Sequence, residues 1–281
     1  MDASLLQEIV GAIREGSAVP YLGPGALAGV RHTETGAPLP ATGDELILAL
    51  NNGQPMAPRL MYEFPRAAMH VELKRGRAQL TKFLNATYGD GHWTRSAFHD
   101  WLRGLAPPYV IDINRDTQLQ SLYAATPHTL VVGVARIGGT DFRYKLWRHD
   151  GGGYAPATEQ DIDPSAPVLF KPHGTPLPQP NYIASDADYV DYITELMGGF
   201  AIPGFLKAKR RGMKYVLLGM RLNRDTERMV LSDMIHGCAQ PAGWALIREP
   251  GDKERRFCRR LGLQVVEASL GELMEPALAA A

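Results

Sequence analysis

Apolar residues along the chain alternate between helically spaced stripes and short continuous runs. The spacing of Leu6, Ile9 and Ile13 predicts an N-terminal helix. The apolar run 18–22 follows and predicts a strand, which leads into a glycine-rich turn over 23–29. A helix, a strand and a glycine turn in this order are a common beginning of a nucleotide-binding α/β core.

The rest of the chain continues this alternation of strands and helices. Short apolar runs predict strands at residues 109–113, 129–134, 168–171, 215–218, 244–247 and 264–266. Helical spacing predicts helices at 186–197, 225–235 and 253–261, and a last helix after Ser269. Apolar segments that flank Asp150 and the following glycines predict a hairpin over about 142–156. The pattern predicts an α/β fold, Rossmann-like and doubly wound, with a mainly parallel sheet in one domain over 1–281.

The pattern changes over residues 31–108, where predicted helices follow one another without strands between them. Thr42 is placed to cap a helix that begins beside it. Longer helices are predicted over 65–84 and 93–105. We expect this stretch to be a helical insertion or a cap over the site.

Composition narrows the classes of partner. Lys and Arg together number 30, as do Asp and Glu, so the formal net charge is zero and gives no indication of a nucleic-acid partner. The two cysteines, Cys238 and Cys258, are too few for a zinc site with four cysteine ligands, and we expect no metal. Neither a signal peptide nor an apolar run of roughly 18 residues is recognisable. We therefore expect a cytoplasmic protein without a membrane partner.

Four predicted strands end on glycine or polar residues, namely Gly23, Asn114, His173 and Gly219. Ligands of parallel sheets bind at the carboxyl ends of the strands, so these residues are candidates for one site. Histidine is the usual general base near neutral pH, and a carboxamide can orient a water or a ribose hydroxyl. Plainer alternatives stay open: a tight turn for the glycines, a helix cap for Asn114 and Asp116, and a structural contact for His173.

Taken together and in order, these elements resemble the sirtuin-like family. In particular they resemble its bacterial branch that lacks the zinc module and includes NAD-hydrolysing defence proteins. The match spans most of the chain, and its specificity lies in the order of short motifs. These motifs are Gly23-Pro24-Gly25-Ala26, Asn114-Arg115-Asp116, Lys171-Pro172-His173-Gly174, Ser185-Asp186-Ala187-Asp188-Tyr189, Leu218-Gly219-Met220-Arg221-Leu222 and Gly262-Leu263-Gln264-Val265-Val266.

The resemblance implies a single sirtuin-like domain that binds NAD and hydrolyses it to nicotinamide and ADP-ribose without a metal. It implies that His173 acts as a base, that Asn114 positions the attacking water, and that Asp116 lies close by as a third catalytic residue. Removing nicotinamide builds positive charge on the ribose carbon, as in glycoside hydrolysis. The residues implied to hold NAD are Gly23, Pro24, Gly25, Ala26, Gly219, Met220, Arg221 and Asn223.

Several positions depart from the family's pattern. Asp112 and Ile113 stand where Thr or Gln is common before the asparagine, Pro24 replaces a small residue, and Arg221 stands where Ser is usual. These changes are compatible with nucleotide binding, but they weaken the expectation of catalytic turnover. A catalytically degenerate sensor of NAD or ADP-ribose and a purely structural module are therefore alternatives to the hydrolase. A homo-oligomer or a protein partner is compatible with each of them.

Overall fold

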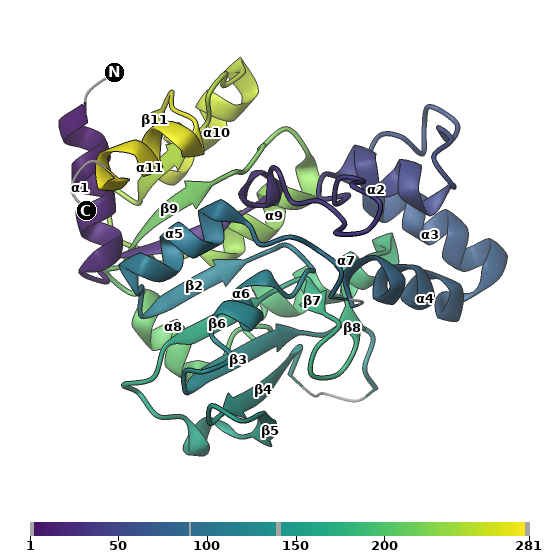
Figure 1. The fold of residues 1–281 in the computed structure, drawn as a ribbon, viewed down its shortest axis with the longest axis horizontal. Helices are drawn as coiled ribbons and strands as arrows, with labels where there is room; N and C mark the ends of the chain where they lie inside the picture. The colour runs from purple at the N-terminus through teal and green to yellow at the C-terminus, as the bar shows by residue number, and fades with distance from the viewer. Residues whose placement is uncertain (1–2, 90, 139–141, 279–281) are drawn as a thin grey trace.

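A nine-stranded sheet forms the centre of the computed structural model, which describes residues 3–89, 91–138 and 142–278. Its strands lie in the order β11-β10-β9-β1-β2-β6-β3-β4-β5 (Figure 1). They are β1 (Ala18–Leu22), β2 (Tyr109–Asp112), β3 (His128–Gly133), β4 (Tyr144–His149), β5 (Tyr154–Ala157), β6 (Val168–Lys171), β9 (Lys214–Leu218), β10 (Gly243–Leu246) and β11 (Leu263–Val266). A small separate sheet pairs β7 (Gly174–Thr175) with β8 (Asn181–Tyr182).

The strands from β11 to β3 in this order are all parallel, and β4 and β5 add an antiparallel hairpin at the β3 edge. This confirms the predicted α/β fold with a doubly wound, mainly parallel sheet. The hairpin turn is held by Asp150, whose Oδ1 accepts the backbone N–H groups of Gly152 and Gly153 at 2.8 and 3.2 Å. The central strands are continuous apolar runs because helices cover both of their faces.

Two helical layers cover the sheet. One face packs against α1 (Ala3–Arg14), α5 (Ala97–Leu105), α6 (Gln118–Leu122) and α11 (Leu270–Leu278). The other packs against α7 (Asp186–Met197), α8 (Gly204–Arg210), α9 (Asp225–Met234) and α10 (Asp252–Leu261). Along β2, Val110 belongs to the first core and Ile111 to the second, as the alternation of side chains along a strand requires. Within the described ranges, no helix is both long enough and apolar enough to cross a membrane.

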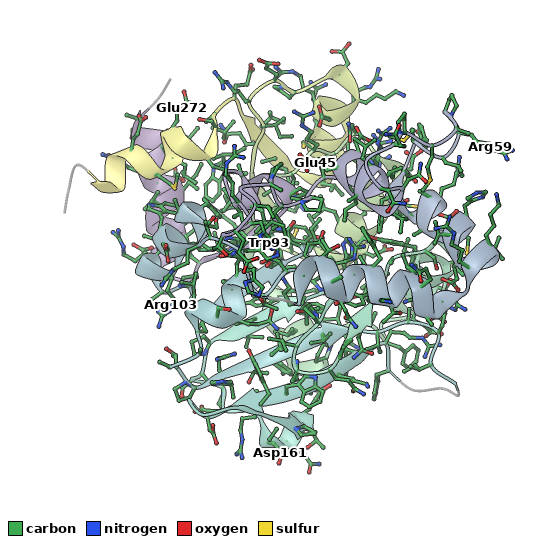
Figure 2. All side chains as sticks on the ribbon, turned by 45° about the vertical axis from the view of Figure 1, so that its right-hand side comes forward. Glu45, Arg59, Trp93, Arg103, Asp161 and Glu272 are labelled. Atoms are coloured by element: carbon green, nitrogen blue, oxygen red, sulfur yellow. The ribbon has the colours of Figure 1, made fainter. Side chains whose placement is uncertain are left out.

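A third core lies in a cap formed by α2 (Gly43–Leu50), α3 (Phe64–Arg75) and α4 (Arg77–Tyr88). Figure 1 shows the cap beside the sheet, and Figure 2 shows Arg59 at its outer end. The single helix predicted over 65–84 is wrong, because Gly76 interrupts it with a φ of 84°. Thr42 caps α2 as predicted, since its side chain accepts the N–H of Glu45.

The predicted helix over 93–105 begins only at Ala97, and it does not belong to the cap. Ser96 is the N-cap of α5, because its hydroxyl accepts the N–H of His99. The same hydroxyl donates to the carbonyl of Ala26 at 2.7 Å. The apolar residues Phe98 and Leu102 of α5 lie in the same core as α1. The cap therefore consists of α2 to α4, and the chain returns to the sheet through α5.

The turns after β1 and β9 pack directly against each other. Gly23 N donates to Leu218 O, and Gly25 N donates to Gly219 O, both at 2.9 Å. A Cβ at Gly25 would lie 2.8 Å from the Cα of Gly219, and a Cβ at Gly219 would lie 2.6 Å from Ala26 N. Gly219 also has a φ of +70°, which residues with a Cβ adopt at a cost. Close packing of two backbones explains these glycines.

We predict that Gly219→Ala lowers the free energy of unfolding by about 3 kcal/mol, through backbone strain and a steric clash. Gly11→Ala is the matched control, because nothing lies within 4 Å of a Cβ at Gly11 in α1. There alanine favours the helix and raises stability by about 0.5 to 1 kcal/mol. Chemical denaturation of both variants checks the pair, and equal stabilities would contradict the packing of the two turns.

Candidate functional site

A cleft of about 870 Å³ lies between the carboxyl ends of the central strands and the cap. It adjoins β1, where the order of the sheet reverses, because β2 lies on one side of β1 and β9 on the other. In open α/β sheets, ligands bind at such a topological switch point. Predicted site residues in the lining of this cleft are Pro24, Gly25, Asn114, His173, Gly219, Met220, Arg221 and Asn223.

Asn114 follows β2, and its carboxamide is held in a fixed orientation. Its Nδ2 donates to the carbonyl of Gly23 and to Asp112 Oδ1, both at 2.9 Å. Two acceptors around one atom identify that atom as the nitrogen, so Oδ1 is the other end of the group. No described residue donates to this Oδ1, and Asn114 lines the cleft. The oxygen can therefore accept a hydrogen bond from a water or a hydroxyl group.

A buried ion pair fixes the position of Asp112, to which Asn114 is hydrogen-bonded. Lys171 Nζ lies 2.7 Å from Asp112 Oδ2, and both side chains are 0% exposed. The pair forms because β2 and β6 are neighbours in register, with Ile111 opposite Phe170 just before it. Burial raises the pKa of Asp112, and the charge of Lys171 opposes that rise. Asp112 thus bonds Lys171 through one oxygen and Asn114 through the other.

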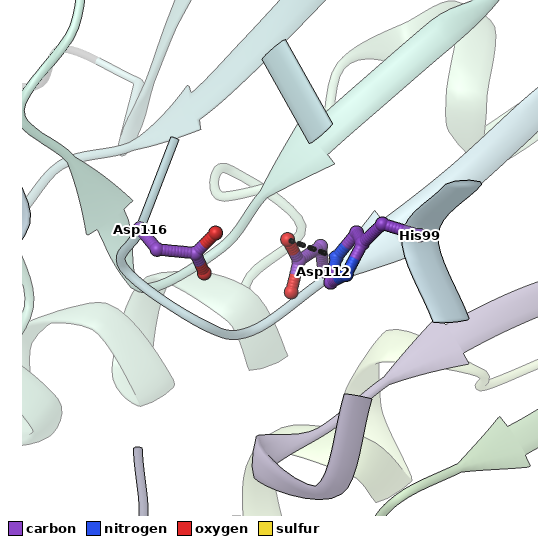
Figure 3. Close-up of side chains that lie close together, drawn as sticks. All are labelled: His99, Asp112 and Asp116. Atoms are coloured by element: carbon purple, nitrogen blue, oxygen red, sulfur yellow. Dashed lines mark ion pairs between the residues drawn. The ribbon is translucent and has the colours of Figure 1, made fainter. Parts of the chain in front are cut away.

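His99 and Asp116 join this buried group (Figure 3). One ligand atom from each of His99, Asp112 and Asp116 lies within 4.8 Å of the others, which is close enough to hold a metal ion. However, Lys171 Nζ lies 2.7 Å from Asp112 Oδ2 and 3.8 Å from Asp116 Oδ2. The lysine thus supplies, beside both carboxylates, the positive charge that a metal would bring. We assign no metal to these residues.

Asp116 does not line the cleft, although the resemblance implies a catalytic role. Its Oδ1 accepts the N–H of Gln118 at 2.8 Å, where α6 begins. Its Oδ2 is buried without a hydrogen-bond partner among the described residues and faces Lys171. These contacts are those of a residue that shapes the turn before α6 and adjoins the ion pair. The N-cap of α6 is Thr117, so Asp116 is not the helix cap that was the plainer alternative.

His173 follows β6 and is a buried, neutral imidazole. Burial lowers its pKa well below the ordinary value, the charge of Arg115 lowers it further, and a hydrogen bond to the Ile113 backbone opposes both. Its Nε2 has no hydrogen-bond partner among the described residues. The ring also packs edge-on against Tyr189, with 5.3 Å between the ring centroids. Nε2 is therefore a buried nitrogen without a partner among the described residues, on a side chain that lines the cleft.

The start of the glycine turn, from Gly23 to Ala26, does not offer its N–H groups to a phosphate. Gly23 N and Gly25 N donate to the β9 turn, Ala26 N donates to Gly23 O at 3.0 Å, and Pro24 has no N–H. Gly23 and Ala26 are also outside the lining of the cleft, although Gly23 holds Asn114 through its carbonyl. The turn is a rigid wall of the cleft, and any anion there must be bound by other groups.

Four polar residues of the site were not among the sequence candidates: Asp112, Lys171, Arg115 and Glu227. A recognisable signal existed for the first two, since each is the one charged residue of a predicted apolar strand and lies at the same end. Arg115 and Glu227 line the cleft. Burial raises the pKa of Glu227 to about 7, and its Oε2 is buried without a hydrogen-bond partner in the described ranges. No sequence pattern distinguished these two from surface residues.

We predict that Lys171→Met costs about 3 to 5 kcal/mol of stability at about pH 8, because Asp112 becomes an uncompensated buried charge. Without the lysine, the pKa of Asp112 rises further above its value in the unfolded chain. The folded state then binds more protons than the unfolded state, so stability falls as the pH rises. The deficit relative to wild type should shrink at about pH 5 in denaturation experiments. A deficit independent of pH would contradict the ion pair.

Comparisons with known proteins do not place the chain in a family. No protein-family model matches the sequence. No curated protein matches it significantly either. The candidate site is therefore defined by its own geometry, with the free acceptors of Asn114 and His173 on one cleft at the switch point of the sheet.

Proposed function

We propose that the chain binds NAD in this cleft and hydrolyses it to nicotinamide and ADP-ribose. The observation that carries the proposal is that Asn114 Oδ1 and His173 Nε2, both without a partner among the described residues, belong to side chains that line the same cleft. Two acceptors suit the hydroxyl groups of a ribose and an attacking water. The cleft volume of about 870 Å³ is within the usual range for small-molecule sites.

In this proposal, His173 Nε2 accepts a proton from a ribose hydroxyl or from the attacking water. Asn114 Oδ1 accepts a hydrogen bond from that water and fixes its direction, because Asp112 and Gly23 hold the other end of the carboxamide. As nicotinamide leaves, positive charge develops on the ribose carbon. The carboxamide oxygen and the carboxylate of Glu227 are two groups of the lining that can stabilise this charge.

A sensor that binds NAD without turnover is the second candidate. One observation favours it: the N–H groups of Gly23, Gly25 and Ala26 are all used within the protein. Fewer fixed donors for the phosphates mean that less binding energy is available to orient the ribose for reaction. The two candidates share the cleft and differ in whether nicotinamide is released.

We predict that the purified protein releases nicotinamide from NAD. His173→Ala and Asn114→Ala should each lower the rate by about 100-fold or more, through loss of the base or of the positioned water. His236→Ala is the control, because His236 is exposed and outside the cleft lining. Chromatography of the products gives the rates. Saturable NAD binding without release would support the sensor, and the absence of any thermal shift with NAD would contradict both candidates.

The pH dependence of this release is a separate prediction. The pKa of His173 lies well below 6.5, so the base stays neutral and His173 causes no fall in rate between about pH 8 and pH 6. Glu227 has a pKa of about 7, so a change of rate near that pH belongs to Glu227 and should vanish in Glu227→Gln. A fall near pH 6.5 that persists in Glu227→Gln would contradict a buried, neutral His173.

A further inference from the structure

Arg115 is a buried cation of the site to which the proposed function gives no role. It follows Asn114, is 7% exposed and lines the cleft. Its Nε and Nη2 both donate to the carbonyl of Ile183, at 3.1 and 2.5 Å, and Nη2 also donates to the hydroxyl of Tyr189 at 3.1 Å. A guanidinium has five N–H donors. The two on Nη1 have no partner among the described residues.

The Arg115 guanidinium lies over the ring of Phe64, 5.4 Å from its centroid, but no carboxylate in the described ranges lies within ion-pair distance of it. Its charge still acts on the site, since it lowers the pKa of His173 and opposes the rise in the pKa values of Tyr88 and Tyr182. Buried charges in proteins are usually paired, because removing an ion from water is costly. An anionic group of a ligand would provide the missing partner.

The neighbours of Arg115 indicate which anionic ligand this is. Asn114 and His173 offer acceptors, which suit hydroxyl groups, whereas Arg115 offers two donors on one nitrogen, which suit phosphate oxygens. The N–H groups of Gly23, Gly25 and Ala26 donate within the protein, which favours a side chain as the ligand of the phosphate. A ribose that carries a phosphate satisfies both kinds of group.

We propose that Arg115 binds the phosphate of the ribose 5′-phosphate unit whose hydroxyl groups meet Asn114 and His173. In NAD, this unit is the nicotinamide mononucleotide half. The proposal rests on the proposed function for the identity of the base. For the phosphate, it rests on a buried cation that has no carboxylate partner among the described residues. A purely structural role, in which Arg115 only ties Ile183 to Tyr189, is the competing explanation of its burial.

The first test uses the wild-type protein and two ligands that differ by one phosphate. Calorimetric titration compares nicotinamide mononucleotide with nicotinamide riboside. We expect the mononucleotide to bind about 10- to 100-fold more tightly, the range of charge-assisted hydrogen bonds. Equal affinities would overturn the proposal, because a structural Arg115 would not distinguish the two ligands.

The second test compares variants. Arg115→Gln should abolish the preference for the mononucleotide and leave the affinity for the riboside unchanged, whereas Arg115→Lys should keep part of the preference through its charge. Arg59→Gln removes the same charge from an exposed position outside the cleft lining and should keep the whole preference (Figure 2). A preference that persists in Arg115→Gln would overturn the proposal. If that variant does not fold, the lysine variant and the wild-type comparison decide.

The outcomes separate this inference from the proposed function. A preference for the mononucleotide that depends on Arg115, without any binding of NAD, would support the phosphate site and contradict the proposed function. Binding of NAD together with equal affinities for mononucleotide and riboside would support the proposed function and contradict the phosphate site. Absence of binding for all three ligands would contradict both.

Discussion

The candidate site depends on one buried ion pair, between Asp112 and Lys171. The two residues end adjacent parallel strands, so the sheet itself brings them together. Asp112 in turn accepts two hydrogen bonds from Asn114 and thereby fixes the end of the carboxamide that is left free. A buried pair of this kind adds little to stability by itself, but it is costly to break and geometrically strict. The sheet thus positions a polar group at the floor of the cleft without relying on a flexible loop.

The second constraint is the contact between the turns after β1 and β9. Their glycines allow two backbones to touch, and this uses the N–H groups that a phosphate-binding loop would leave open. The contact gives the cleft a rigid wall and leaves the N–H groups of Gly23, Gly25 and Ala26 unavailable to an anion. Arg115 is the cation of the lining that is both buried and without a carboxylate partner among the described residues. Together, the Asp112–Lys171 pair and the contact between the two turns determine which polar atoms of the lining remain free.

Much of the fold could be predicted from the sequence, because the apolar runs of β1, β6 and β9 and the helical spacing of α7 and α9 are strong local signals. Gly76 was missed as a break in the cap, since a single glycine inside a periodic stretch does not by itself end a helix. Positions at strand ends led to Asn114 and His173, which do share the cleft. The roles of Asp112 and Arg115 depend on partners about 60 to 70 residues away, Lys171 and Ile183, and such contacts leave no local pattern.

The central claim is that the free acceptors of Asn114 and His173 receive the ribose of NAD. A crystal structure of the protein soaked with ADP-ribose, the product that lacks the nicotinamide, tests this most directly. The account predicts ribose hydroxyl groups within hydrogen-bond distance of Asn114 Oδ1 and His173 Nε2. A ligand bound with its ribose away from both atoms, or bound outside the cleft, would contradict it.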